Sequence, residues 1–97
     1  MDLNEAQRLQ IRQLASQFVG SDSRVYALLR DQGPGSREIQ ILAEVTYALR
    51  DRWGSEKQLA ARLGNPLTGF KTQVFLVDSK TPARMEHRRI RVMGQEL

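Results

Sequence analysis

Hydrophobic residues at the start of the chain repeat at the spacing of a helix. Ile11, Leu14 and Phe18 are three or four positions apart, so they fall on one face of a helix with 3.6 residues per turn. Gly20 follows, and glycine often ends a helix because it tolerates backbone conformations that other residues avoid. This pattern predicts a first helix over residues 3–19.

Helical spacing continues through the middle of the chain. In the stretch 22–31, Val25, Leu28 and Leu29 are spaced for one helix face, which predicts a short second helix. The stretch 36–53 is apolar around much of its circumference when drawn as a helix. A helix of that kind is buried on more than one side, so we predict a central third helix there.

Local capping signals predict a fourth helix. Ser55 and Gln58 have the spacing of a capping box, in which two side chains satisfy the free N–H groups of the first turn. Gly64 then offers a residue suited to the end of the helix. We therefore expect a helix from Ser55 to about Leu63.

The pattern changes after Leu67. Residues 74–77 are a short continuous run of β-branched and aromatic side chains, which favours a buried strand. Residues 89–92 alternate between arginine and an aliphatic residue, as a half-buried strand does, and residues 79–82 have the chemistry of a turn. These features predict a C-terminal β-hairpin.

The expected fold class is α+β and mostly helical, with about four helices followed by a C-terminal β-hairpin. A chain of 97 residues suits a single domain, 1–97. We expect residues 1–53 to form a helical part with a dimerisation or docking surface, and residues 55–97 to carry a DNA-binding part. The start of the chain lacks the basic and apolar segments of a secretory signal, so a cytoplasmic location is expected.

Positive charge is concentrated in the second half. The net charge is +4, but residues 1–48 hold five cations against six acids, whereas residues 49–97 hold ten cations against five acids. Such an asymmetry indicates that the second half contacts an anionic partner. An ordinary solvated basic surface is the alternative interpretation.

The stretch Glu56–Phe75 resembles the helix-turn-helix of phage repressors and of winged-helix DNA-binding proteins. The matching positions are the small residue that lets two helices approach, the turn glycine and the apolar residues that pack the motif: Leu59, Ala60, Leu63, Gly64 and Phe70. The resemblance implies a second, recognition helix over about 66–72. Asn65 and Gln73 depart from the pattern, since apolar residues are usual at both positions. A loop over 65–69 that leads directly into a strand is the alternative.

The candidate DNA-binding residues come from two sources. The resemblance implies that Thr68, Lys71 and Thr72 face the DNA and that Lys57 contacts its backbone. The predicted hairpin adds cations suited to phosphate contacts: Lys80, Arg84, Arg88, Arg89 and Arg91. Arginines that protect an exposed strand edge from pairing are the alternative for the hairpin.

An enzyme is not expected. The chain has no cysteine and a single histidine, His87, so thiol chemistry is excluded and no cofactor or metal is predicted. The expected function is a small regulatory protein that binds duplex DNA, as a monomer or a homodimer. The alternative is a non-enzymatic adaptor or inhibitor that docks an acidic protein through its basic C-terminal face. Met85 and Met93 suggest an adaptable binding surface, but two isolated methionines more often fill gaps in the core, which is the interpretation we favour.

Overall fold

The computed structural model describes residues 3–31 and 33–97. These residues form three helices and a four-stranded sheet. In chain order the elements are α1 (Glu5–Val19), β1 (Arg24–Asp31), β2 (Arg37–Glu44), α2 (Arg52–Leu63), β3 (Lys71–Val77), α3 (Met85–Met93) and β4 (Gln95–Glu96).

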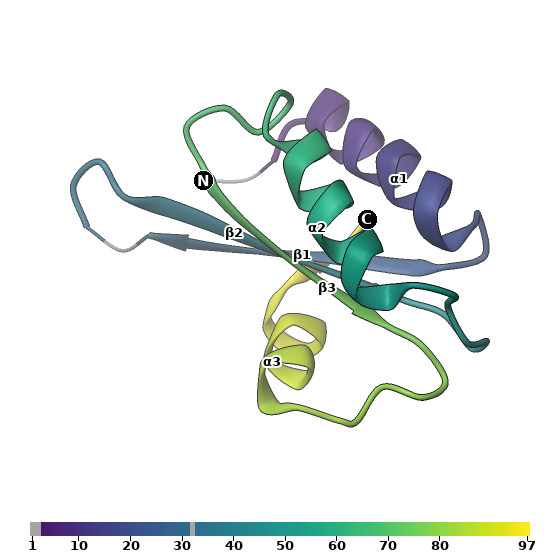
Figure 1. Ribbon diagram of the computed structural model, residues 1–97. Helices are drawn as coiled ribbons and strands as arrows, with labels where there is room; N and C mark the ends of the chain where they lie inside the picture. The colour runs from purple at the N-terminus through teal and green to yellow at the C-terminus, as the bar shows by residue number, and fades with distance from the viewer. Residues whose placement is uncertain (1–2, 32) are drawn as a thin grey trace.

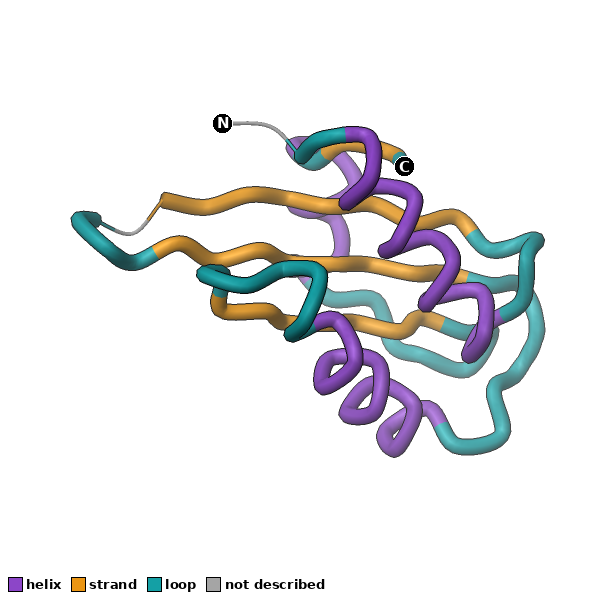
Figure 2. The backbone as a smooth tube through the Cα atoms, turned by 90° about the horizontal axis from the view of Figure 1, so that it is seen from above, coloured by secondary structure: helices purple, strands orange, loops and turns teal. Residues whose placement is uncertain are grey.

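The sheet lies between two unequal helical layers. Its strand order is β3-β2-β1-β4, with β2 and β3 parallel and the other neighbours antiparallel. Helices α1 and α2 cover one face, and α3 alone covers part of the other (Figure 1). Figure 2 shows the three long strands side by side, with the β1–β2 hairpin extending past the helices. Because α2 connects two parallel strands, it forms a β-α-β crossover rather than the first half of a helical motif.

The first predicted helix is confirmed, but the next two are wrong. Helix α1 begins after Asn4, whose side chain and that of Gln7 form a reciprocal capping box. The segments predicted as the second and third helices instead contain the antiparallel strands β1 and β2. The fold is therefore α+β with a mixed sheet, not four helices and a hairpin.

Burial on both faces explains this error. Along β2, Ile39 and Ile41 pack toward α1 and α2, whereas Leu42 packs with residues under α3. Strands covered on both faces lose the alternation of polar and apolar residues and resemble buried helices in sequence. The apolar residues on more than one side of 36–53 thus reflect a central strand, β2, and not a central helix.

The C-terminal half also differs from the predicted hairpin. The strand expected at 74–77 is present within β3, but residues 89–92 belong to helix α3. In α3 the buried residues are His87 and Ile90, which are three positions apart, as helical packing requires. Val92 is 72% exposed whereas Ile90 is fully buried, so these two residues do not share one buried side as a strand would require.

Two hydrophobic clusters hold the layers together. The larger cluster joins α1 and α2 to one face of the sheet and includes the fully buried Ile11, Leu59 and Leu63. The smaller cluster consists of Tyr26, Leu42 and Ile90, with partly buried neighbours, and attaches α3 to the opposite face. Helix α3 is therefore held by much less buried apolar surface than the other helices, since burial scales with area removed from water.

The outer edge of β3 is occupied at one residue by side chains from α2. The Glu56 carboxylate accepts the N–H of Leu76 at 2.7 Å, and the Arg52 guanidinium donates to the carbonyl of Leu76 at 3.3 Å. Arg52 and Glu56 also form an ion pair at 3.4 Å. Both backbone groups of this edge residue are thus satisfied within the chain.

Thr72 carries a buried hydroxyl on β3. Within the part of the chain that the structure describes, its Oγ1 has no hydrogen-bond partner. A buried polar atom without a partner destabilises a fold, so Thr72→Val, which keeps the shape and removes the hydroxyl, should raise the free energy of unfolding by about 1 kcal/mol. Urea titration of both proteins measures this change. A lower midpoint for the variant would contradict the assignment of an unpaired hydroxyl.

Candidate interaction surface on α3

Helix α3 packs on the sheet through one narrow face. Ile90 is fully buried against Tyr26 and Leu42, and the His87 ring meets Phe75 edge to face, with ring centroids 5.4 Å apart. Contacts of this kind fix the rotation of a helix about its own axis. The side of α3 that carries His87 and Ile90 therefore faces the sheet, and the opposite side of the helix faces solvent.

The C-terminal end of α3 is fixed by its connection to β4. The Gly94 N–H donates to the carbonyl of Ile90 at 2.8 Å, and Gln95 then pairs with Ala27 in the sheet. Near the same end, the Arg91 Nε donates to a Glu44 carboxylate oxygen at 3.0 Å. These contacts hold the last turn of α3 against β1 and β2.

The outer side of α3 is apolar along its centre line. Met85 and Val92 are 81% and 72% exposed, and at seven residues apart they lie within ~20° of one another around the helix. On the same geometry, His87 and Ile90 lie ~150° away on either side, so the apolar line points directly away from the sheet. Met93, 68% exposed, extends the apolar surface on one side.

Two arginines flank this apolar line. Arg88 and Arg89 are exposed and lie ~50° to either side of it. Segment 84–93 holds four arginines and one glutamate. We call Met85, Arg88, Arg89, Val92 and Met93 the α3 surface. Together these five residues line a shallow hollow of about 350 Å³.

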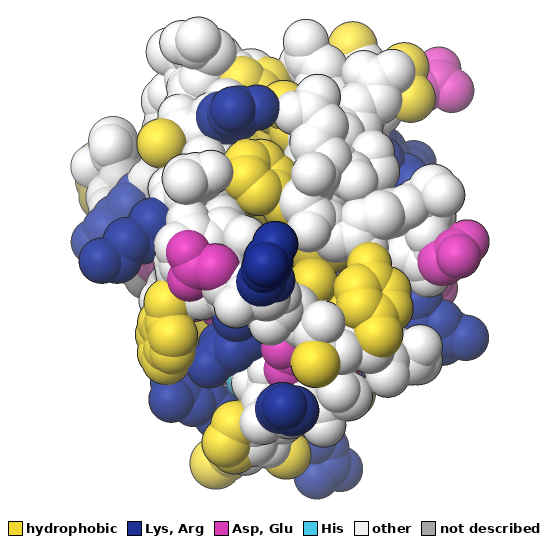
Figure 3. Space-filling model, turned by 45° about the vertical axis from the view of Figure 1, so that its right-hand side comes forward, with side chains coloured by type: hydrophobic (Ala, Val, Ile, Leu, Met, Phe, Trp, Pro, Cys, Tyr) yellow, Lys and Arg dark blue, Asp and Glu magenta, His cyan; other side chains and the backbone are white. Residues whose placement is uncertain are grey.

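A second hollow of about 540 Å³ lies beside the first and extends the surface toward Arg84 and Arg91. Helix α3 lies in the lower part of Figure 3, where dark blue cationic side chains surround yellow apolar ones. Exposed apolar groups within a cationic surround are characteristic of sites that contact another molecule.

Beneath the α3 surface, burial lowers the pKa of His87 below its ordinary value of 6.5. The nearby charges of Arg84 and Arg91 act in the same direction, and that of Arg52 does so more weakly. Glu86 opposes them. A neutral imidazole therefore packs against Phe75 at neutral pH.

This environment predicts a pH dependence of stability. Because the folded state binds a proton at His87 less readily than the unfolded chain does, the free energy of unfolding should fall as pH drops below about 6.5. Thermal unfolding between pH 7.5 and pH 5 measures this loss. His87→Phe, which keeps an aromatic ring against Phe75, should flatten the dependence in that window. An unchanged slope in the variant would assign the dependence to other groups.

The DNA-binding residues implied by the helix-turn-helix resemblance do not lie together on one helix face in the structure. Residues 64–69 form successive turns and not a second helix, and β3 begins at Lys71, so Pro66–Thr72 does not present a recognition face. Thr68 lies in these turns and donates its hydroxyl to the carbonyl of Asn65 at 2.8 Å. Lys71 is the exposed first residue of β3, and the Thr72 hydroxyl is buried. Lys57 is exposed on α2.

The residues predicted on the hairpin are partly brought together. Arg84, Arg88, Arg89 and Arg91 all lie on or next to α3, whereas Lys80 lies in the turn after β3. Arg89 and Arg91 were predicted on one side of a strand, but in a helix they are ~160° apart, and Arg91 pairs with Glu44. The two arginines therefore cannot follow one line of phosphates as a strand would.

The favoured interpretation of the sequence was wrong for the apolar half of the surface. Met85 and Met93 were interpreted as core residues, and Val92 as the inner side of a strand, but all three are exposed. Helical spacing gave the available signal: once His87 and Ile90 are taken as the buried pair, Met85 and Val92 must point outward.

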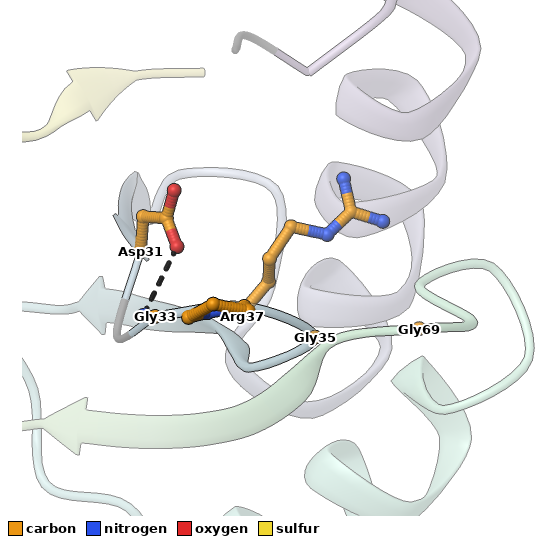
Figure 4. A pocket seen from close by; sticks show the side chains of 6 residues that line it. Asp31, Gly33, Gly35, Arg37 and Gly69 are labelled. Carbon is orange, nitrogen blue, oxygen red and sulfur yellow. Dashed lines mark hydrogen bonds between the residues drawn. The ribbon is translucent and has the colours of Figure 1, made fainter.

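Another hollow, of about 750 Å³, lies at the end of the β1–β2 hairpin (Figure 4). Asp31 accepts the N–H of Gly33 at 3.3 Å, and the Arg37 side chain extends away from Asp31. The Arg37 guanidinium stacks over the Phe70 ring, with its Cζ 4.7 Å from the ring centroid. The residues that line this hollow therefore include a carboxylate that is engaged in the turn and an arginine that is stacked on a ring. No nucleophile and base contact each other among these lining residues, as nucleophilic catalysis would require.

Two other properties constrain the site. Among residues 3–31 and 33–97, no three His, Cys, Asp or Glu side chains are grouped so that they could hold a metal ion. Over the same residues, no helix has the length and apolarity needed to cross a membrane.

Comparisons with known proteins give a fold likeness. No protein-family model matches the chain, and no curated protein matches it. Among solved structures, a crystal structure of a protein from Shewanella oneidensis is similar, with a TM-score of 0.54 over 98% of this chain and 71% of that chain. The two sequences are 17% identical, so the likeness concerns the arrangement of helices and strands alone.

Proposed function

We propose that this chain is a non-enzymatic adaptor or inhibitor that docks an acidic protein through the α3 surface. The observation that carries the proposal is the apolar line of Met85 and Val92, which points away from the sheet between Arg88 and Arg89. Exposed methionine is adaptable, and arginine is enriched at protein interfaces, so the composition suits a protein partner.

Duplex DNA is the less favoured partner. Phosphates are recognised by cations and polar groups, and the phosphate backbone offers no apolar counterpart to Met85 and Val92. The predicted recognition helix is replaced by turns, and the second strand of the predicted hairpin by α3. What still favours DNA is the surplus of five cations in residues 49–97.

The test is selection of peptides from an unconstrained random display library on the full chain. We expect recovered peptides to bind Met85→Gln/Val92→Gln at least tenfold more weakly than the original protein. Both positions are exposed and glutamine is a good helix former, so this variant should fold normally, as circular dichroism can verify.

A mixed-sequence duplex provides the competing arm, titrated at 50, 100 and 200 mM salt. Peptides that depend on the α3 surface, with weak or no duplex binding at 200 mM salt, support the proposal. If no recovered peptide depends on the α3 surface, the proposal fails. Micromolar duplex binding that weakens steeply with salt, and that is equally strong for Met85→Gln/Val92→Gln and the original protein, would establish DNA as the partner.

A further inference from the structure

We infer that the partner segment is an acidic amphipathic helix that lies along α3, with apolar residues against Met85 and Val92 and carboxylates toward Arg88 and Arg89. This inference rests on the proposed docking function and specifies the chemistry of its partner. It follows from the spacing, the charge and the extent of the α3 surface.

The spacing of the surface matches a helix better than a strand. Met85, Arg88, Arg89 and Val92 occupy positions i, i+3, i+4 and i+7, the repeat by which two helices meet along a common line. The apolar residues are ~10 Å apart along the axis, which equals two turns. A facing helix repeats its own apolar residues at the same distance, whereas an extended strand repeats them every ~7 Å.

The positive charge of the α3 surface indicates that the partner helix is negatively charged. Arg88 and Arg89 lie on opposite sides of the apolar line, so a helix resting on that line has both of its flanks within reach of a guanidinium. Carboxylates on both flanks would meet these cations in bidentate geometry. A basic partner would place like charges against each other without screening by bulk water.

The same charges argue against a second copy of this chain. If two α3 helices packed antiparallel about a two-fold axis, Arg88 and Arg89 of each copy would meet at the centre of the contact. Four cations would then face one another, and the single acidic residue of α3, Glu86, lies ~110° from the apolar line. A different chain that carries negative charge would pair with these arginines, whereas a second copy would repel them.

The surface is short, and this sets the expected affinity. Helix α3 has nine residues, so a partner helix contacts about two turns. Contacts of this size belong to the weak, transient class of interface, for which dissociation constants of ~10–100 μM are expected.

The probe is a designed 18-residue alanine-based peptide that carries leucine at i, i+3 and i+7 and glutamate on both flanks. Its controls are the same peptide with lysine in place of each glutamate and a scrambled peptide of identical composition. Fluorescence anisotropy at 150 mM salt measures binding to the full-length chain. We expect the acidic helix to bind, and the lysine and scrambled peptides to bind at least tenfold more weakly.

Charge reversal tests the assignment of the two arginines. The variant Arg88→Glu/Arg89→Glu should no longer bind the acidic peptide and should instead bind the lysine peptide. The control is Arg50→Glu/Lys57→Glu, which changes the net charge equally at exposed positions on and before α2 and should bind as the original protein does. If both variants lose the acidic peptide equally, the effect is general electrostatics and the inference is overturned.

The docking function and the helical form of the partner can be contradicted separately. If library peptides depend on the α3 surface and are acidic but contain proline, and the designed acidic helix does not bind, the docking function stands and the helical form of the partner is wrong. If neither the designed helix nor any library peptide depends on the α3 surface, both are wrong. A sedimentation profile with a dimer that Arg88→Glu/Arg89→Glu strengthens would instead assign the surface to a second copy.

Discussion

Replacing Gly94 with alanine will destabilise the fold by about 3 kcal/mol, because a side chain at this position meets backbone on two sides. A Cβ there would lie 2.4 Å from the carbonyl oxygen of Ile90 and 2.7 Å from that of Ala27. Neither oxygen belongs to a flexible side chain that can rotate away. The last turn of α3 or the pairing of β4 with β1 must therefore shift, and the tie between them is lost.

Gly64→Ala provides the matched control. Gly64 has right-handed helical angles, φ −58° and ψ −36°, and an added Cβ meets nothing closer than a carbonyl oxygen at 3.3 Å. This contact is tight but much longer than those at Gly94, and alanine also restricts the unfolded chain, so the free energy of unfolding is expected to change by less than ~1 kcal/mol. Urea denaturation of both variants makes the comparison. Equal stability of Gly94→Ala and the original protein would show that the α3–β4 junction is looser than the structure indicates.

Asp78→Ala should lower the free energy of unfolding by about 2–3 kcal/mol. The Asp78 carboxylate accepts the N–H of Leu49 at 2.9 Å, the N–H of Lys80 at 3.0 Å and the hydroxyl of Thr81 at 2.7 Å. It therefore joins the loop before α2 to the loop before α3. Removing it leaves three donors without their charged acceptor, and hydrogen bonds to charged groups are among the strong ones.

The same contacts predict how stability depends on acid. The N–H of Leu49 and the hydroxyl of Thr81 lower the pKa of Asp78 from 3.8 to about 2. Because the folded pKa is the lower one, the stabilisation is complete above about pH 5 and is lost as the pH falls through 3.8 toward 2. Asp78→Asn keeps the shape without the charge and should reduce this acid-dependent loss.

Asp22→Ala is the control for both measurements, because Asp22 is an exposed carboxylate in the turn before β1. Its removal should change the free energy of unfolding by less than ~0.5 kcal/mol. If Asp78→Ala behaves as Asp22→Ala does, the carboxylate does not connect the two loops.

Helix α1 was predictable because it is a surface helix. One face packs on the core and the other meets water, so the repeat of Ile11, Leu14 and Phe18 reports the helical period directly. Strand β3 was also predictable, since its β-branched and aromatic run has low helical preference. Strands β1 and β2 were not, because layers on both sides of the sheet erase the alternation that distinguishes a strand.

The candidate site shows the same division. Charge composition predicted an interaction in the C-terminal half, and four of the arginines proposed there lie on or next to α3. Their arrangement was not predictable, because the alternation of residues 89–92 fits a strand, whereas the true signal is the buried pair His87 and Ile90. Whether Val92 points inward or outward depends on that choice alone, and the apolar half of the surface depends on Val92.

The contacts that α2 makes with β3 have a consequence for the behaviour of the protein at high concentration. A sheet grows into fibrils when an incoming strand can pair along an uninterrupted edge. At Leu76 that edge is filled by Glu56 and Arg52, so a strand added outside β3 would have to displace an ion pair before it could extend past this residue. The hydrogen bonds that complete the fold at Leu76 thus also act as a barrier to aggregation.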